Sequence, residues 1–242
     1  MQKSGNNTTL EIGIAIDHNR RAEDWVLPED LTTVPSRRDF QGNLVPNTPV
    51  ILDIFQREIA QFHFRDSELL PPGMKFVFLE RWFQEYPWLY PFFKRSVKTS
   101  ILPKRLHDSE VGTILAIVYI DGINSQRLVT FLHVNLNADR TGNWRPPDMF
   151  THGNRLYCDP DTAYNVDCYF ANSGTPHECD QRKGYNTILR KLVISAGNYI
   201  GLGRVISAPF EGAYSNAILD KLGFLSDGKV RYLPLTVMEP PC

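Results

Sequence analysis

The stretch Gln181-Arg182-Lys183-Gly184-Tyr185-Asn186-Thr187 decides the fold, because it joins a predicted strand and loop to the start of a strongly patterned helix. The first turn of a helix has backbone N–H groups without intrahelical partners and carries the positive end of the helix dipole. Gly184 permits close approach of a ligand and an unusual φ angle, and Arg182 and Lys183 add positive charge. The stretch therefore predicts a phosphate-binding site.

The helix that follows is the best-patterned element of the sequence. It is predicted over 185–200, with Gly201 as its C′ residue and with Arg190 and Lys191 off the apolar stripe. The spacing of the stripe is that of one face of an amphipathic helix. Its members are Ile188, Leu189, Leu192, Val193, Ala196, Tyr199 and Ile200.

Strands and helices alternate around this helix. A strand is predicted over 164–170 before it, and after it come a strand over 204–208, a short helix over 214–222 and a terminal strand over 229–238. The order of the second half is therefore strand, loop, helix, strand, helix, strand.

Two motifs in this half resemble those of the GNAT superfamily, the GCN5-related N-acyltransferases. The family's coenzyme A signature is Gln/Arg-x-x-Gly-x-Gly/Ala, and the chain has Gln181-x-x-Gly184-x-Asn186 at the same strand-to-helix junction. The run Ser215-Asn216-Ala217-Ile218-Leu219-Asp220-Lys221-Leu222-Gly223-Phe224 is similar to the family's short helix ending in Leu-Gly-Phe. The resemblance covers 164–238, extends to the hairpin from Val111 and hardly touches the first hundred residues.

The resemblance implies an α/β (α+β) fold. Its central sheet is expected to be mixed and mostly antiparallel, flanked by helices, with 164–170 and 204–208 as two central, parallel, splayed strands. The chain adds an aromatic-rich N-terminal helical region. We expect an irregular arm over 1–47 and a single GNAT-like domain over 48–242, with a helical acceptor-side region at 48–110 and the sheet and CoA-binding core at 111–242.

The resemblance further implies acyl transfer from CoA, with acetyl-CoA or another acyl-CoA as co-substrate. In such enzymes the loop amides bind the pyrophosphate, the splayed strands admit the pantetheine arm and a backbone N–H polarises the thioester carbonyl. The residues that this assigns to the cofactor are Phe170, Gln181, Arg182, Lys183, Gly184, Tyr185, Asn186 and Thr187.

Three positions depart from the family's pattern. Asn186 stands where Gly or Ala is usual, so its side chain is expected either to crowd the pyrophosphate or to contact it. The connection from Phe170 to Gln181 is long, with Ser173 to Asp180 as an insertion. Leu219 occupies the place of the usual Tyr acid.

Other side chains are therefore candidates for the catalytic groups. Tyr214 or Ser215 is a candidate proton donor to sulfur, alongside water, since Ser215 shares a helix face with the position of the missing Tyr. Glu211 and Asp167 are candidate bases. His177 and Cys179 suggest a nucleophile pair or a metal site, but we expect their closeness in a polar loop to be incidental, and no metal is predicted.

The first half is less regular. The arm carries one strand candidate at 10–16, and a helix begins at Thr48-Pro49 with Ile51, Leu52, Phe55, Ile59 and Phe62 at helical spacing. A second helical stretch is predicted over 77–85. A hairpin of strands 114–120 and 128–136 follows, with His133 as a half-buried strand histidine.

The segment 76–93 between these elements is rich in aromatic residues. Its two interpretations are core packing and a wall over an apolar substrate, and we expect it to set acceptor specificity. Its aromatic residues are Phe76, Phe78, Trp82, Phe83, Tyr86, Trp88, Tyr90, Phe92 and Phe93.

Composition excludes several classes of protein. The 26 Lys plus Arg against 27 Asp plus Glu give a formal net charge of −1, which excludes a nucleic-acid binder acting through overall charge. The longest apolar run, 114–120, is far shorter than the ~20 residues of a membrane helix, so no membrane span is predicted. No secretory signal is visible in 1–9, which predicts a cytoplasmic location, and the four cysteines are expected to be reduced.

Three functions remain open. The first is transfer of an acyl group from CoA to an amine of a small metabolite. The second is a GNAT-like domain that loads an acyl group from CoA onto an acyl carrier protein, in some cases with decarboxylation. Two interpretations of a nearby cationic cluster are a docking surface for the acidic carrier and a solvated face; its members are Lys94, Arg95, Lys98, Lys104 and Arg105. The third is a non-catalytic CoA-binding or interaction module, which the departures at Asn186 and Leu219 would fit.

Overall fold

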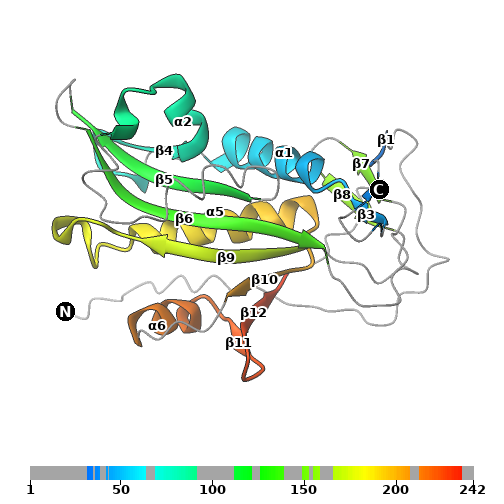
Figure 1. The fold of residues 1–242 in the computed structure, drawn as a ribbon. Helices are drawn as coiled ribbons and strands as arrows, with labels where there is room; N and C mark the ends of the chain where they lie inside the picture. The colour runs from blue at the N-terminus through cyan, green and yellow to red at the C-terminus, as the bar shows by residue number, and fades with distance from the viewer. Residues whose placement is uncertain are drawn as a thin grey trace, which may run out of the picture.

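A seven-stranded sheet organises the part of the chain that the structure, a computed structural model, describes (Figure 1). The described residues are 32–34, 36–38, 42, 44–63, 69–91, 112–121, 126–138, 149–152, 155–158, 166–207 and 213–235. The strand order is β11-β12-β10-β9-β6-β5-β4. Neighbouring strands are antiparallel except β9 and β10, which are parallel. The mostly antiparallel sheet with one central parallel pair is confirmed.

The elements around α5 follow the predicted order, with β11 as an additional short strand. Helix α5 (Tyr185–Ile200) connects the parallel pair, and helix α6 (Ala213–Lys221) follows β10, as the sequence predicted. The predicted hairpin is also confirmed as β5 and β6. The strand bounds are β4 Met74–Phe78, β5 Gly112–Ile120, β6 Gln126–Ala138, β9 Val166–Gly174, β10 Arg204–Ser207, β11 Leu225–Ser226 and β12 Arg231–Pro234.

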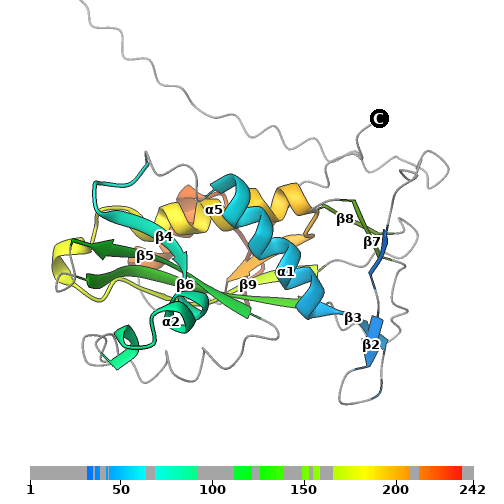
Figure 2. The ribbon, with the colours of Figure 1, turned by 90° about the horizontal axis from the view of Figure 1, so that it is seen from above.

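Helices cover both faces of the sheet (Figure 2). On one face, α1 (Thr48–Glu58), which continues into the π-helical turn Ile59–His63, packs beside α5. Their apolar side chains meet Leu115 and Ile117 of β5 in the larger hydrophobic core. On the opposite face, α2 (Leu79–Glu85) packs on Ile114, Ala116 and Val118, because successive side chains of β5 point to opposite faces.

The segment 74–78 corrects one expectation. The second helix was predicted to begin at Val77, but Met74–Phe78 is the edge strand β4, paired with β5, and the helix begins at Leu79. Phe76 and Phe78 point into the larger core, while Val77 lies against the smaller one. The region 48–110 is therefore not wholly helical, since alternating burial against a neighbouring strand prevailed over a short helical pattern.

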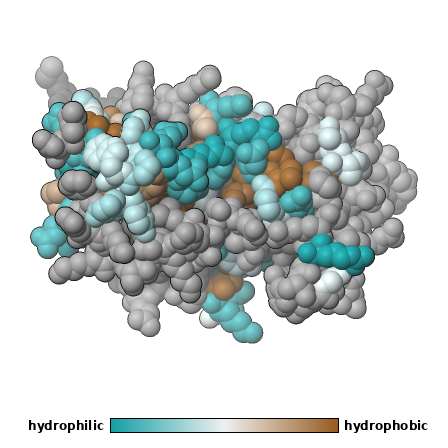
Figure 3. All heavy atoms as spheres, turned by 45° about the horizontal axis from the view of Figure 1, so that its top comes forward, coloured by the Kyte–Doolittle hydropathy of each residue, from teal (hydrophilic) through white to brown (hydrophobic). Residues whose placement is uncertain are grey.

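The aromatic residues of α2 and the turn after it are mostly packed. Trp82 and Phe83 are 4% and 8% exposed, whereas Tyr86 and Trp88 remain 41% and 48% exposed. Hydrophilic and hydrophobic residues lie side by side on the surface that Figure 3 turns forward. Phe92 and Phe93 lie outside the described residues. Core packing thus accounts for most of the described aromatic cluster, and a role in acceptor specificity stays a prediction.

Helix α5 also differs from its predicted pattern at two positions. Arg190, expected off the apolar stripe, is 1% exposed, and Tyr199, expected on the stripe, is 37% exposed. The other members of the stripe are buried or half-buried against the sheet. Arg190 is buried because side chains of the sheet and of α5 itself receive its guanidinium, as described below.

Short strands from the N-terminal region and from 149–158 form two small sheets. The strands β1 (Thr32–Thr33), β7 (Met149–His152) and β8 (Arg155–Cys158) form one, and β2 (Ser36–Arg38) pairs with β3 (Leu44–Pro46) in the other. The strand predicted at 10–16 lies outside the described residues. Among the helices that the structure describes, none has the length and apolar character to cross a membrane.

Candidate functional site

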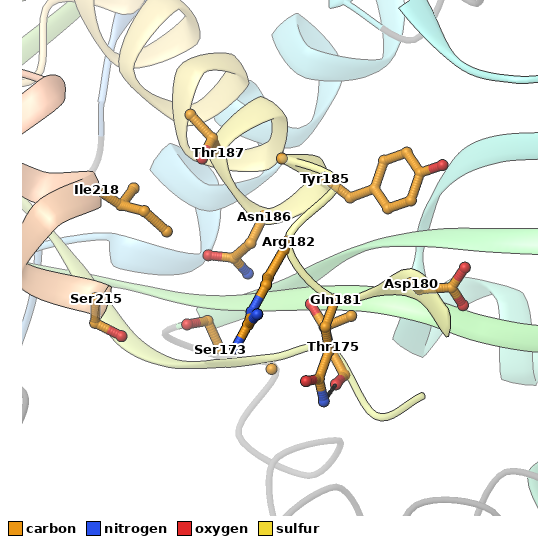
Figure 4. A pocket seen from close by; sticks show the side chains of 12 residues that line it. Ser173, Thr175, Asp180, Gln181, Arg182, Tyr185, Asn186, Thr187, Ser215 and Ile218 are labelled. Carbon is orange, nitrogen blue, oxygen red and sulfur yellow. Dashed lines mark hydrogen bonds between the residues drawn. The ribbon is translucent and has the colours of Figure 1, made fainter. Parts of the chain in front are cut away.

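A cavity of about 410 Å³ lies at the start of α5, between β9 and α6 (Figure 4). Its wall combines the end of β9, the loop before α5, the first turn of α5 and one face of α6. The lining residues are Ser173, Gly174, Thr175, Asp180, Gln181, Arg182, Gly184, Tyr185, Asn186, Thr187, Ser215 and Ile218. Six of the predicted cofactor residues and one predicted catalytic residue, Ser215, line the cavity together. One of the six, Tyr185, points its ring away from the cavity in Figure 4.

The backbone at the helix start has the geometry of an anion site. Gly184 is the N-cap residue of α5 with φ 83°, and Arg182 also has a positive φ of 60°. Gly184 has no side chain to cap the helix, so the first-turn N–H groups of α5 remain available to a ligand. Both Gly184 and Thr187 line the cavity. The helix start that the sequence predicts to bind an anion therefore lies at a concave surface, and anion binding there stays a prediction.

A basic groove of about 380 Å³ continues from the cavity between α5 and α6. Arg182, Gly184, Thr187 and Ile218 line both spaces, which makes them one continuous surface. The groove adds three further cations, Lys183, Lys191 and Lys221, and no carboxylate occurs among its described lining residues. The surface thus favours a ligand with more than one negative charge.

An ion pair fixes the loop that leads into α5. Both carboxylate oxygens of Asp180 accept hydrogen bonds of 3.0 Å from Arg127 of β6, through Nε and Nη2. The Asp180 side chain is fully buried and that of Arg127 is 32% exposed. Arg127 lies over the ring of Tyr119, 4.5 Å from its centroid. The hydrogen bonds from Arg127 hold the pKa of Asp180 below its ordinary value.

The side-chain amide of Asn186 forms hydrogen bonds within the protein. Its Nδ2 donates to the carbonyl oxygen of Phe131 at 3.1 Å and to Thr130 Oγ1 at 3.4 Å, both on β6. Its Oδ1 accepts from Arg190 Nε at 2.9 Å. Its amide thus ties the first turn of α5 to the sheet, while Asn186 also lines the cavity, and its contact with the pyrophosphate stays a prediction.

Arg190 extends this buried network to β9. Its Nη2 donates to Ser173 Oγ at 3.2 Å, and its guanidinium lies 4.9 Å from the centre of the Phe170 ring. Burial lowers the pKa of Arg190 to about 10, so the group keeps its charge at neutral pH. The sequence signal for this contact is the Asn186–Arg190 spacing of four residues on one helix face.

The described pairing of β9 with β10 ends near the cavity. Their last paired residues are Phe170 and Ser207, and β9 continues to Gly174 without a β10 partner among the described residues. Pairing of β9 with β6 shifts register between Phe170 and Asn172, which leaves Ala171 as an extra, bulged residue. Ser173 and Gly174, expected as part of an inserted loop, belong to this extended strand.

The candidate catalytic residues are only partly brought together. Ser215 lines the cavity, and Leu219, in the place of the usual Tyr, is fully buried. Asp167 is 2% exposed and forms two hydrogen bonds, of 2.8 and 2.9 Å, with Arg204, and it lines neither of the two described spaces. Tyr214 lies in α6 and its side chain is not described, while Glu211 lies outside the described residues. The assignment of a base stays a prediction.

The remaining predicted residues take distinct places. Phe170 lies in the core, 5.9 Å from Phe224 between ring centroids, and its contact with CoA stays a prediction. His133 is 1% exposed, so it is fully buried where half-burial was expected. Cys179 is exposed as a free thiol. Among the described residues, no group of three or more His, Cys, Asp or Glu side chains is placed to hold a metal ion.

The mostly antiparallel sheet with one parallel pair joined by α5 matches the GNAT-like α/β fold that the sequence predicted. No protein-family model matches the chain, and no curated protein matches it significantly. Among solved structures, the KacTA–DNA complex is 15% identical with a TM-score of 0.36, covering 54% of this chain and 72% of that one.

Two further solved structures are similar at the same level. AtaTR bound with acetyl-CoA is 10% identical with a TM-score of 0.34, covering 54% of this chain and 75% of that one. The Salmonella typhimurium protein yncA with acetyl-CoA is 13% identical with a TM-score of 0.31, covering 86% of this chain and 98% of that one. Structures this distant do not indicate the ligand or substrate of this chain, which have to be inferred from the geometry of its site.

Proposed function

We propose that this protein transfers an acyl group from CoA to an amine of a small molecule. The observation that carries the proposal is the uncapped start of α5, opened by Gly184 and Arg182 in left-handed conformations, at the floor of a cavity that continues into a basic groove. Backbone N–H groups at a helix start suit a pyrophosphate. The further cations of the groove suit the 3′-phosphate of CoA, the phosphate group that dephospho-CoA lacks.

The residues present fit CoA along its length. Arg182, Lys183, Lys191 and Lys221 would hold its phosphate groups at the groove, and the space between β9 and α6 would admit the pantetheine arm. The bulge at Ala171, in the part of β9 beyond β10, is a natural source of a backbone N–H for the thioester carbonyl. CoA supplies the activated acyl group, and the chain supplies its orientation.

The acceptor is proposed to be a small molecule for a charge-based reason. The net charge is −1, and the described cations of the site gather in one groove, where phosphate groups would occupy them. This leaves little positive charge beside the acyl end for a polyanionic acceptor. An amine acceptor needs a base, for which Glu211 and Asp167 remain proposals, with Ser215 and Tyr214 as proposed proton donors.

The test is binding followed by turnover. Isothermal titration with acetyl-CoA is expected to give one site per chain, and a free-thiol release assay over a panel of small amines is expected to give acceptor-dependent release of CoA. Absence of acetyl-CoA binding would contradict the proposal. Binding without release over the whole panel would favour the non-catalytic module, and release only with an acyl carrier protein would favour the loading function.

A further inference from the structure

The wall of the cavity carries one hydroxyl that is backed by a buried cation. Ser173 lines the cavity from the part of β9 beyond β10, two residues after the bulged Ala171. Its Oγ accepts a hydrogen bond of 3.2 Å from Arg190 Nη2. Among the described residues, the Ser173 hydroxyl has no acceptor for its own proton. The proton is therefore available to a ligand in the cavity.

The cation behind Ser173 is held in one position. Arg190 is 1% exposed, its Nε donates to Asn186 Oδ1 at 2.9 Å, and its guanidinium lies 4.9 Å from the centre of the Phe170 ring. A hydroxyl that accepts a hydrogen bond from a fixed cation becomes a stronger donor, because successive hydrogen bonds polarise one another. Ser215, on α6, also lines the cavity, but no such hydrogen bond from a cation reaches it among the described residues.

We propose that Ser173, positioned and polarised by Arg190, donates a hydrogen bond to the CoA sulfur as the acyl group leaves. This inference rests on the proposed function. In the transfer, the amine nitrogen bonds to the acyl carbon, the carbon–sulfur bond breaks with its electron pair going to sulfur, and the proton lost by the amine ends on the sulfur. Ser173 keeps its own proton and stabilises the negative charge on sulfur.

Ser173 would replace the Tyr acid that is usual in the family and absent from this chain. The family's usual Tyr acid corresponds to Leu219, which is fully buried and does not line the cavity. Ser173 is a catalytic residue in this scheme, and Arg190 is a positioning residue, since it acts through Ser173. Two of the departures from the family's pattern are then related. Leu219 removes the usual proton donor, and Asn186 holds in place Arg190, which positions the replacement donor Ser173.

Free CoA is the probe for the experiment, because its thiol ionises without an acceptor. The ultraviolet absorbance of the thiolate is followed during a pH titration of CoA bound to the protein. The bound thiol is expected to show an about ten-fold higher thiolate fraction than free CoA at the same pH below its ordinary pKa. Ser173→Ala is expected to remove this increase while changing the affinity for acetyl-CoA by less than about two-fold.

Matched variants separate the hydrogen bond from other causes. Ser195→Ala, on the exposed side of α5, keeps the increase. Arg190→Met loses it, and Arg190→Lys, which keeps the charge, retains part of it. The charged groups that line the cavity, Asp180 and Arg182, are present in every variant and contribute equally to all of them.

Several outcomes would overturn the inference. An unchanged thiolate fraction in Ser173→Ala would do so, as would loss of the increase in Ser215→Ala instead. A wild-type protein that binds CoA without raising its thiolate fraction also contradicts the assignment of Ser173 while leaving the proposed function intact. Failure of the wild-type protein to bind CoA at all would contradict the proposed function itself.

Discussion

The two faces of the central sheet are covered by different kinds of chemical group. On the α2 face, Trp82, Phe83 and Leu79 are buried against the apolar side of β5 and β6. On the α5 face, the apolar core gives way at the cavity to backbone N–H groups, hydroxyls and the buried Asn186–Arg190 network. In this protein the cluster of aromatic residues on the α2 face contributes to stability. The candidate site lies instead where polar residues, among them Asn186 and Arg190, occur in α5 beside its apolar stripe.

The comparison predicts that mutations on the two faces separate stability from binding. A change on the α2 face should lower the free energy of unfolding and leave CoA affinity unchanged. A change at the start of α5 should lower CoA affinity by more than its effect on folding explains. The variants below are ordered by the size of their expected effect.

Trp82→Ala is expected to have the largest effect, on stability alone. Trp82 is 4% exposed and packs 5.6 Å from Phe83 between ring centroids. Removing a buried indole costs about 3–5 kcal/mol, through lost burial and a residual cavity. Urea unfolding measures this loss, and titration of the folded variant should give wild-type affinity for acetyl-CoA. A large loss of affinity would place α2 at the donor site and break the comparison.

Gly184→Val is expected to weaken acetyl-CoA binding by at least about a hundred-fold, or about 2.7 kcal/mol. Gly184 has φ 83°, and a Cβ built there meets nothing within 4 Å, so a larger side chain projects into open space over the helix start. Gly184→Ala is the control, because it places a Cβ at the same positive φ with less obstruction and less strain than the β-branched Val. Equal affinity in wild type and Gly184→Val would show that the pyrophosphate assignment is wrong.

Asp180→Asn is expected to destabilise the protein by about 1–3 kcal/mol at pH 7, since it leaves Arg127 without its buried partner. The folded-state pKa of Asp180 lies below its unfolded value, so its stabilisation is complete above about pH 4 and is lost as pH falls through the lowered folded pKa. Urea unfolding at neutral and acidic pH should therefore show a difference between variant and wild type that shrinks in acid. A pH-independent difference would exclude the charge as its cause.

The double variant Lys191→Ala/Lys221→Ala is expected to have the smallest effect, an about three- to ten-fold loss of CoA affinity. Both side chains line the basic groove, where surface charges act through a screened field. The loss should shrink with added salt and should be absent for dephospho-CoA, which lacks one phosphate group. Titration calorimetry at two ionic strengths measures it. An equal loss of affinity for CoA and dephospho-CoA would show that the phosphate group by which they differ does not bind in the groove.

Local sequence signals were enough to predict the α5 side of the fold. Gly184 after two cations, the apolar stripe of α5 and the Leu-Gly-Phe end of α6 are short-range patterns, and each element formed close to its predicted bounds. Strand β4 was mistaken for helix because Phe76, Val77 and Phe78 alternate between two cores that only the tertiary fold creates. Arg190 was missed for a similar reason, since its partner Ser173 lies on another element.

The most direct test of the central claim is an amide NMR titration of the full chain with CoA. If CoA binds with its pyrophosphate at the start of α5, the largest chemical-shift changes are expected at residues 182–187 and 173–175, with smaller ones at the α6 face of the cavity. Residues 79–90 of the α2 side should change little. Shifts concentrated at 79–90, with 182–187 unaffected, would contradict the assignment of the start of α5 as the phosphate site.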